Sequence, residues 1–203
     1  MKYLLALGTL CAGLAVTSCA SNPGYQELLL PPETISQLGY SITPLNEKGW
    51  YVRVRDPQHL TIGKYGEYSD QTFAIDGLLV TLPELRTIEE LTTFVKGQQT
   101  TFPDPRRFTL LKYEIDVYSK KGPNCIKSHS VMTDHAANNR SGTRGDMDLE
   151  SYTLVCIHPK DKGVAVHLMY TQRHWPGQGD PQFLEKATTI FDSVALVDPK
   201  PKP

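Results

Sequence analysis

Alternation of apolar and polar side chains is the dominant pattern between residues 50 and 175, and it is clearest in residues 109–118. A period of two is typical of a half-buried β-strand. Four apolar side chains fall on one face of this segment and three charged ones on the other: Leu111, Tyr113, Ile115 and Val117 against Lys112, Glu114 and Asp116. Turn-forming residues 120–124 follow, and residues 125–133 are expected to return as the partner strand.

The same pattern predicts further strands on both sides of this hairpin. Residues 50–55 are rich in β-formers, and residues 71–82 alternate with Gly77 as an expected bend or bulge. Residues 152–158 and 164–172 read as a second hairpin around the turn at 159–163.

Two segments instead show a helical period. Thr87 and Glu90 form a capping box ahead of an apolar stripe, and Gly97 is expected to end this first helix. The second helix is expected to open at Asp180 and Pro181, as an N-cap followed by a proline. Its broad apolar stripe needs a sheet face to cover. The stripe consists of Phe183, Leu184, Ala187, Ile190, Phe191 and Val194.

This order of elements predicts an α+β fold, a mainly antiparallel sheet with two amphipathic helices packed on it. Residues 37–197 are expected to form the single domain. Residues 19–36 contain three prolines and no sustained period, which favours a tether. Residues 198–203 alternate proline and lysine after Asp198, which favours a loose tail.

The N-terminus carries the features of an export signal. Lys2 precedes an uncharged, mostly apolar run over residues 3–16, which is too short to span a bilayer as a stable helix. Val16-Thr17-Ser18-Cys19 follows. This run resembles the lipobox of bacterial lipoproteins. The resemblance implies a signal peptide over residues 1–18 and an acylated Cys19 as the mature N-terminus.

The lipoprotein resemblance also implies a location. Two or three acyl chains give stable membrane attachment. In that family an Asp directly after the cysteine favours the inner membrane, and here the residue is Ala20. We therefore expect a lipid anchor in the bacterial outer membrane, with the domain facing the periplasm.

The four cysteines are consistent with export. Cys11 leaves with the signal peptide and Cys19 is acylated, so Cys125 and Cys156 remain. Two leftover cysteines in an oxidising compartment usually pair, and we expect a Cys125–Cys156 disulfide; two free buried thiols are the alternative. If they pair, the two hairpins are neighbours in the sheet.

The arrangement of elements over residues 45–197 resembles the Mog1/PsbP-like α-β-α sandwich. Members of that group serve largely as accessory or binding factors. No residue motif carries the resemblance, so it assigns no functional residue here.

Composition and motifs narrow the function further. Hydrophobic residues make up 39% of the chain and charged residues 21%, with a net charge of −1, which argues against wholesale disorder and a basic nucleic-acid binder. No nucleophile elbow, phosphate-binding loop, dinucleotide fingerprint or zinc-binding helix motif occurs. We therefore expect no cofactor and no metal.

Residues 134–150 form the least regular stretch, and long loops within compact domains are often functional. The alternating carboxylates of this stretch have the oxygen chemistry of calcium ligands, but the spacing of a calcium-binding helix-loop-helix is missing. A solvated loop and a partner-binding loop are both open. The candidate binding residues are Asp134, His135, Arg144, Asp146, Asp148 and Glu150, joined by Trp175 in the loop before the second helix.

The leading hypothesis is a non-catalytic envelope binding or accessory domain with an envelope protein as partner. The alternative is a small periplasmic hydrolase or ligand-binding enzyme that uses loop 134–150 with nearby histidines. His129 facing Glu114 or Asp116 across the hairpin is one possible acid–base pair, subject to strand register. A pocket joining histidine to carboxylate favours the enzyme, and a shallow face with exposed aromatics favours the binding module.

Overall fold

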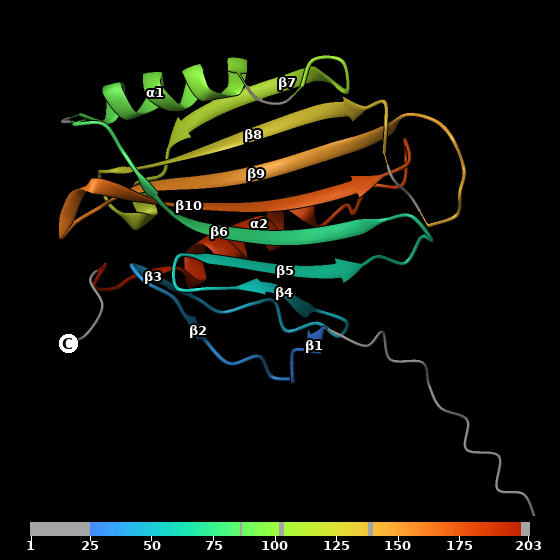
Figure 1. Ribbon diagram of the computed structural model, residues 1–203, viewed down its shortest axis with the longest axis horizontal. Coiled ribbons are helices and arrows are strands. Elements are labelled where there is room, and N and C mark those ends of the chain that lie inside the picture. The colour runs from blue at the N-terminus through green and yellow to red at the C-terminus, as the bar shows by residue number, and fades with distance from the viewer. Residues whose placement is uncertain (1–24, 86, 102–103, 138–139, 200–203) are drawn as a thin grey trace, which may run out of the picture.

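Antiparallel strand pairing organises the protein. The computed structural model describes residues 25–85, 87–101, 104–137 and 140–199. Within these residues, eight strands form one sheet in the order β1-β4-β5-β6-β10-β9-β8-β7, and every neighbouring pair is antiparallel (Figure 1). The strands are β1 (Gln26–Glu27), β4 (Tyr51–Arg55), β5 (His59–Tyr65), β6 (Thr72–Thr81), β7 (Phe108–Val117), β8 (Cys125–Asp134), β9 (Met147–His158) and β10 (Asp161–His174).

Three short strands form a second, smaller sheet. β3 (Tyr40–Ile42) lies between β2 (Ile35–Ser36) and β11 (Ala195–Leu196), so the segment after the last helix returns to the early part of the chain. A 3-10 turn, η1 (Ser119–Lys121), connects β7 to β8. The mostly antiparallel sheet and its two α-helices confirm the expected α+β class.

The two helices cover opposite faces of the large sheet. Along β9, Leu154 and Cys156 belong to the core that includes α2 (Phe183–Ser193). The alternate residues Val155 and Ile157 belong to a second core that includes α1 (Ile88–Thr101). Because successive strand residues point to opposite faces, the helices lie on opposite sides (Figure 1). Neither of these helices has the length and apolar character needed to span a bilayer.

The helix boundaries differ from the expected ones. The capping box of α1 is present, since the Glu90 N–H donates to Thr87 Oγ1 at 3.2 Å and the Thr87 N–H donates to Glu90 Oε2 at 3.3 Å. However, α1 continues through Gly97 to Thr101, and Gly97 does not have the positive φ of a helix-ending glycine. α2 begins at Phe183, while Asp180 caps the preceding turn by accepting the Gln182 N–H at 2.8 Å.

Strand β7 confirms the predicted hairpin but not its full burial pattern. It is the edge strand, and a register shift lies between Leu110 and Lys112. Tyr113 and Ile115 are half-buried, whereas Leu111 and Val117 are exposed. The bulge displaces Leu111 from the expected alternation, because an inserted residue reverses the faces on either side of it.

The disulfide prediction is confirmed. Cys125 and Cys156 are bonded, and they are directly opposite each other in the β8–β9 ladder. Both are buried in the core on the α2 face. The two hairpins are therefore neighbours, as their pairing requires.

The expected tether is largely part of the folded domain. Residues 25–36 are described: β1 pairs with β4, the Leu28 N–H donates to the Trp50 carbonyl at 2.8 Å, and Ile35 is in the core. Leu28 also packs against that core. Packing of Leu28 and Ile35 on the core keeps this segment in the fold despite its prolines, because burial of a leucine or isoleucine stabilises the folded chain.

Gly77 is neither a bend nor a bulge. The register of β6 runs through it without a break towards both β5 and β10. Because Gly77 has no side chain, it leaves room for the buried Tyr40, whose hydroxyl donates to the Gly77 carbonyl at 2.7 Å. A Cβ at Gly77 would lie 2.6 Å from that hydroxyl oxygen.

Two alanine substitutions at glycines have opposite expected effects. We predict that Gly77→Ala lowers the free energy of unfolding by about 1–3 kcal/mol, because the buried Tyr40 must shift. Gly97→Ala is predicted to raise it by up to about 1 kcal/mol, because alanine is the better residue within a helix. A Cβ at Gly97 meets nothing within 4 Å. Urea unfolding measures both, and destabilisation by Gly97→Ala would show that α1 ends there.

Candidate functional site

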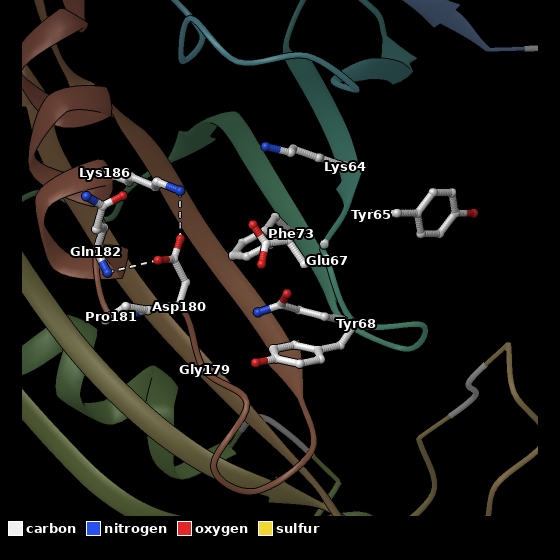
Figure 2. Close-up of a pocket in the computed structure, with 12 residues that line it drawn as sticks. Lys64, Tyr65, Glu67, Tyr68, Phe73, Gly179, Asp180, Pro181, Gln182 and Lys186 are labelled. Atoms are coloured by element: carbon white, nitrogen blue, oxygen red, sulfur yellow. Dashed lines mark hydrogen bonds and ion pairs between the residues drawn. The ribbon is translucent and has the colours of Figure 1, made fainter.

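A cavity of about 440 Å³ opens at one end of the large sheet. One wall is the β5–β6 hairpin, and the other is the chain entering α2 (Figure 2). Tyr68 and Phe73 contribute aromatic surface, while lysine, carboxylate and amide groups supply the polar lining. The lining residues are Lys64–Tyr68, Gln71, Phe73, Gly179–Gln182 and Lys186.

Both lysines of the cavity are paired with carboxylates. Glu47 accepts from Lys64 Nζ at 2.5 Å and lies 2.9 Å from Lys186 Nζ, which also contacts Asp180 at 2.8 Å. Burial acts to raise the pKa of Glu47, but the two lysines outweigh it and hold that pKa below its usual range. The cavity is therefore suited to a polar ligand of low net charge, since its two cations already have carboxylate partners.

A chain of hydrogen bonds leads from this cavity across the sheet. Gln172 Oε1 accepts the Asp180 N–H at 2.9 Å, and Gln172 Nε2 donates to Glu150 at 2.8 Å. Glu150 in turn lies 2.7 Å from His129 Nε2. The His129 ring stacks on Tyr152 with centroids 4.2 Å apart. These contacts fix the orientation of polar side chains on the α2 face, since each long side chain is held at its end.

A row of tyrosines extends from the residue before β1, over β4, to the end of β5. Tyr25 and Tyr51 have ring centroids 5.2 Å apart, and Tyr51 and Tyr65 are 5.8 Å apart. Arg140 lies over Tyr65 with its guanidinium carbon 4.0 Å from the ring centroid. Tyr25 and Tyr65 are exposed by 48% and 43%. In Figure 2, the Tyr65 ring points away from Asp180 and Lys186. We call Tyr25, Tyr51, Tyr65 and Arg140 the tyrosine row.

A glycine allows this row to form on the sheet. Gly63 is opposite Tyr51 in the β4–β5 pair, and a Cβ there would lie 3.2 Å from the Tyr51 ring and 2.9 Å from Arg53 Cδ. Tyr51 therefore lies against the backbone of β5, where a side chain at position 63 would have to displace Tyr51 and Arg53. Burial and its neighbour Tyr65 together raise the pKa of Tyr51 to about 12, so the phenol stays neutral.

Asp70, in the β5–β6 hairpin, holds three loops together. Its carboxylate accepts the N–H groups of Arg140 and Ser141 at 2.9 and 2.8 Å and the Ser141 hydroxyl at 2.6 Å. It also accepts Trp175 Nε1–H at 3.0 Å. The Ser141 hydroxyl, with Trp175 and the backbone groups, lowers the pKa of Asp70 to about 2.

The predicted binding loop is thereby shorter than expected and is attached at several points. β8 ends at Asp134 and β9 begins at Met147, so only residues 135–146 connect them. The half-buried Trp175 lies against this loop, where a Cβ at Gly145 would be 3.1 Å from its ring. Its indole thus fixes one loop to another and is not freely displayed.

Asp134 secures the base of the loop. The fully buried carboxylate accepts two hydrogen bonds from Arg107, at 2.8 and 2.9 Å, and lies 3.3 Å from Arg173. Burial acts to raise the pKa of Asp134, but Arg107, the Ala136 N–H and Arg173 outweigh burial and hold that pKa below its usual range. Asp134 therefore has a structural role in an ion pair, because both of its carboxylate oxygens accept hydrogen bonds from arginine.

His135 and Asp146 meet at the surface. His135 Nδ1 is 3.0 Å from Asp146 Oδ2, and its Nε2 is 2.8 Å from Thr109 Oγ1 on β7. A shallow hollow of about 430 Å³ lies beside His135 and is also lined by Arg144 and Gly145. Thr109, His135 and Asp146 thus form a linear hydroxyl–imidazole–carboxylate series.

The three alternating carboxylates do not converge. Asp146 precedes β9 and pairs with His135, whereas Asp148 and Glu150 are in β9. Glu150 contacts His129, whereas Glu114 is more distant, at 3.8 Å from His129 Nδ1. Within the described residues, no group of three or more histidine, cysteine or acidic side chains is placed to hold a metal ion.

The acylation site Cys19 lies outside the described residues. Sequence reasoning did not identify Asp70, Thr109 or Tyr25 as parts of a site. Asp70 and Trp175 are 105 positions apart, and no local pattern signals that contact. Tyr25 carried no signal because it falls among prolines and glycine.

Comparison with protein-family models gives no match to this chain, and a search of curated proteins gives none either.

The Asp70 cluster makes a pH dependence testable. The folded pKa is about 2 and the unfolded value is about 4, so the ionised carboxylate stabilises the fold above pH 4. That contribution is lost as the pH falls from about 4 towards 2. We predict that Asp70→Asn lowers the melting temperature at pH 6 and that the gap to the parent narrows towards pH 2.5. Asp116→Asn, at an exposed position on β7, is the control, and a gap independent of pH contradicts the assignment.

Proposed function

We propose that the protein is a bacterial lipoprotein, anchored through acylated Cys19 in the outer membrane, whose periplasmic domain binds an envelope protein. It acts as a binding or accessory module. The lipobox-like Val16-Thr17-Ser18-Cys19 and the disulfide between Cys125 and Cys156 support export to an oxidising compartment.

The tyrosine row is the observation that carries the binding role. Tyrosine and arginine are the residue types enriched at the centres of protein interfaces. Here Tyr25, Tyr65 and Arg140 are exposed, and tilted ring contacts and a cation–π contact already hold them in place, so little side-chain freedom remains to be lost when a partner binds. The cavity of low net charge adjoins Tyr65 and offers amide, hydroxyl and carboxylate groups to a polypeptide.

We also propose that the fold is of the Mog1/PsbP-like type. Support comes from the amphipathic α1 after the early strands, the closing α2, and their positions on opposite faces of an antiparallel sheet. No residue role is carried over from that group, since the likeness is one of arrangement.

Photo-crosslinking in the cell tests the binding role. Benzoylphenylalanine at Tyr65 is expected to form a discrete adduct with an envelope protein, and the same substitution at Lys162 none. Lys162 is exposed near the start of β10, outside the tyrosine row and the cavity lining. Adding Arg140→Gln is expected to reduce the adduct about 10-fold or more, as for a central interface residue. Absence of an adduct at Tyr65, or equal adducts at both positions, contradicts the proposal.

A second candidate function, a small hydrolase, is favoured by the series Thr109–His135–Asp146. A hydroxyl, an imidazole and a carboxylate in that order activate the nucleophile in many acyl-transfer enzymes. Thr109 Oγ1 would attack an ester carbonyl and pass its proton to His135 Nε2, which returns it to the leaving alcohol. Water then releases the acid and regenerates Thr109.

Ester hydrolysis distinguishes the two functions. If the series is catalytic, Thr109→Val lowers p-nitrophenyl acetate hydrolysis by about 100-fold or more, as expected for loss of a nucleophile. Thr133→Val changes the neighbour of Thr109 on β8 and is the matched control. Equal rates for the parent and Thr109→Val exclude the hydrolase and leave the binding role untouched.

A further inference from the structure

Three apolar side chains are exposed together at the first described part of the chain. Leu29 is exposed by 85%, the most of any large hydrophobic residue that the structure describes. Leu30 and Tyr25 are exposed by 42% and 48%. Figure 1 shows the segment between β1 and β2 as the lowest part of the described chain, with α1 and β7 at the opposite side.

The backbone beneath these side chains is fixed to the domain. Gln26 and Glu27 pair with Val52 and Tyr51, and Leu28 is hydrogen-bonded to Trp50 while its side chain packs on the core. Leu29 and Leu30 follow directly. They therefore project from an ordered edge of the sheet, which is a defined surface and not a free chain end.

The length of chain before this edge limits its distance from an anchor. Five residues lie between Cys19 and Tyr25, and an extended chain spans at most about 20 Å over those six steps. The eight strands, at about 4.8 Å per neighbour, place β7 about 34 Å beyond β1. An acylated Cys19 would thus hold the β1 edge next to the bilayer and the β7 edge far from it.

We propose that Leu29 and Leu30 contact the lipid bilayer that carries the anchor, so that the β1 edge of the sheet faces the membrane. The inference rests on the proposed acylation of Cys19. Leucine inserts into the boundary between headgroups and acyl chains. Glu27 and Glu33 are the exposed charges within the segment 25–33 and both are acidic, so the contact of this segment is apolar and does not depend on anionic lipid.

Tryptophan fluorescence on vesicles tests this orientation. The chain beginning at Cys19 has one reactive thiol, because Cys125 and Cys156 are bonded. Cys19 is coupled to a maleimide-bearing phospholipid in phosphatidylcholine vesicles. Leu29→Trp and Leu111→Trp are compared with the parent, which contributes Trp50 and Trp175. Leu111 is the matched control, since it is a 61% exposed leucine on β7.

The expected result is that brominated acyl chains quench most of the emission added by Leu29→Trp and none of that added by Leu111→Trp. Equal quenching at both positions overturns the proposal. Quenching at 29 that appears only at high protein density also overturns it, because a second copy would then cover the patch.

The chemical coupling separates this inference from the proposed function. It attaches Cys19 to lipid whether or not the cell acylates it, so the fluorescence reports only on the surface that meets the bilayer. The high exposure of Leu29 means that Leu29→Trp disturbs no packing, and the unfolding midpoint of each variant confirms this.

Discussion

The pairing of β6 with β10 is the contact on which the rest of the fold depends. Ten consecutive residue pairs join Thr72–Thr81 to the segment 164–173. They unite two hairpin systems, 51–81 and 108–174, which α1 connects along the chain. The pairing also builds the core, since Phe73 and Tyr170 stack with centroids 6.3 Å apart and Tyr170 packs on Phe183 of α2. Because β-pairing fixes register residue by residue, it also sets where each strand ends.

The candidate site follows from those strand ends. β6 begins just after the hairpin with Asp70, and β10 ends just before Trp175, so the β6–β10 register brings carboxylate and indole together. Asp70 then accepts hydrogen bonds from the N–H groups of Arg140 and Ser141 in the loop, which places Arg140 over Tyr65. An aromatic surface with an arginine at one end thus results from a single buried ladder and one carboxylate.

Local periods predicted β4, β6, β7, β8, β9 and β10 and both helices, because each has enough alternating or helical repeats. They missed β5, where the apolar positions in alternation are only Leu60 and Ile62 before the polar Lys64. Helix α1 was predicted too short, because an interior glycine reads as a stop when its φ is unknown. The disulfide was predicted from compartment and cysteine number. The Asp70 cluster and the Thr109–His135–Asp146 series were not, because their members meet only after the sheet assembles.

The central claim is a disulfide-bonded domain held at the envelope by an acylated Cys19. Intact mass spectrometry of protein extracted from the membranes of the cells that make it tests this claim most directly. The account predicts a mass of residues 19–203 plus acyl chains, with two hydrogens gained on reduction of the Cys125–Cys156 bond. A mass without acyl chains, or two free thiols before reduction, would contradict it.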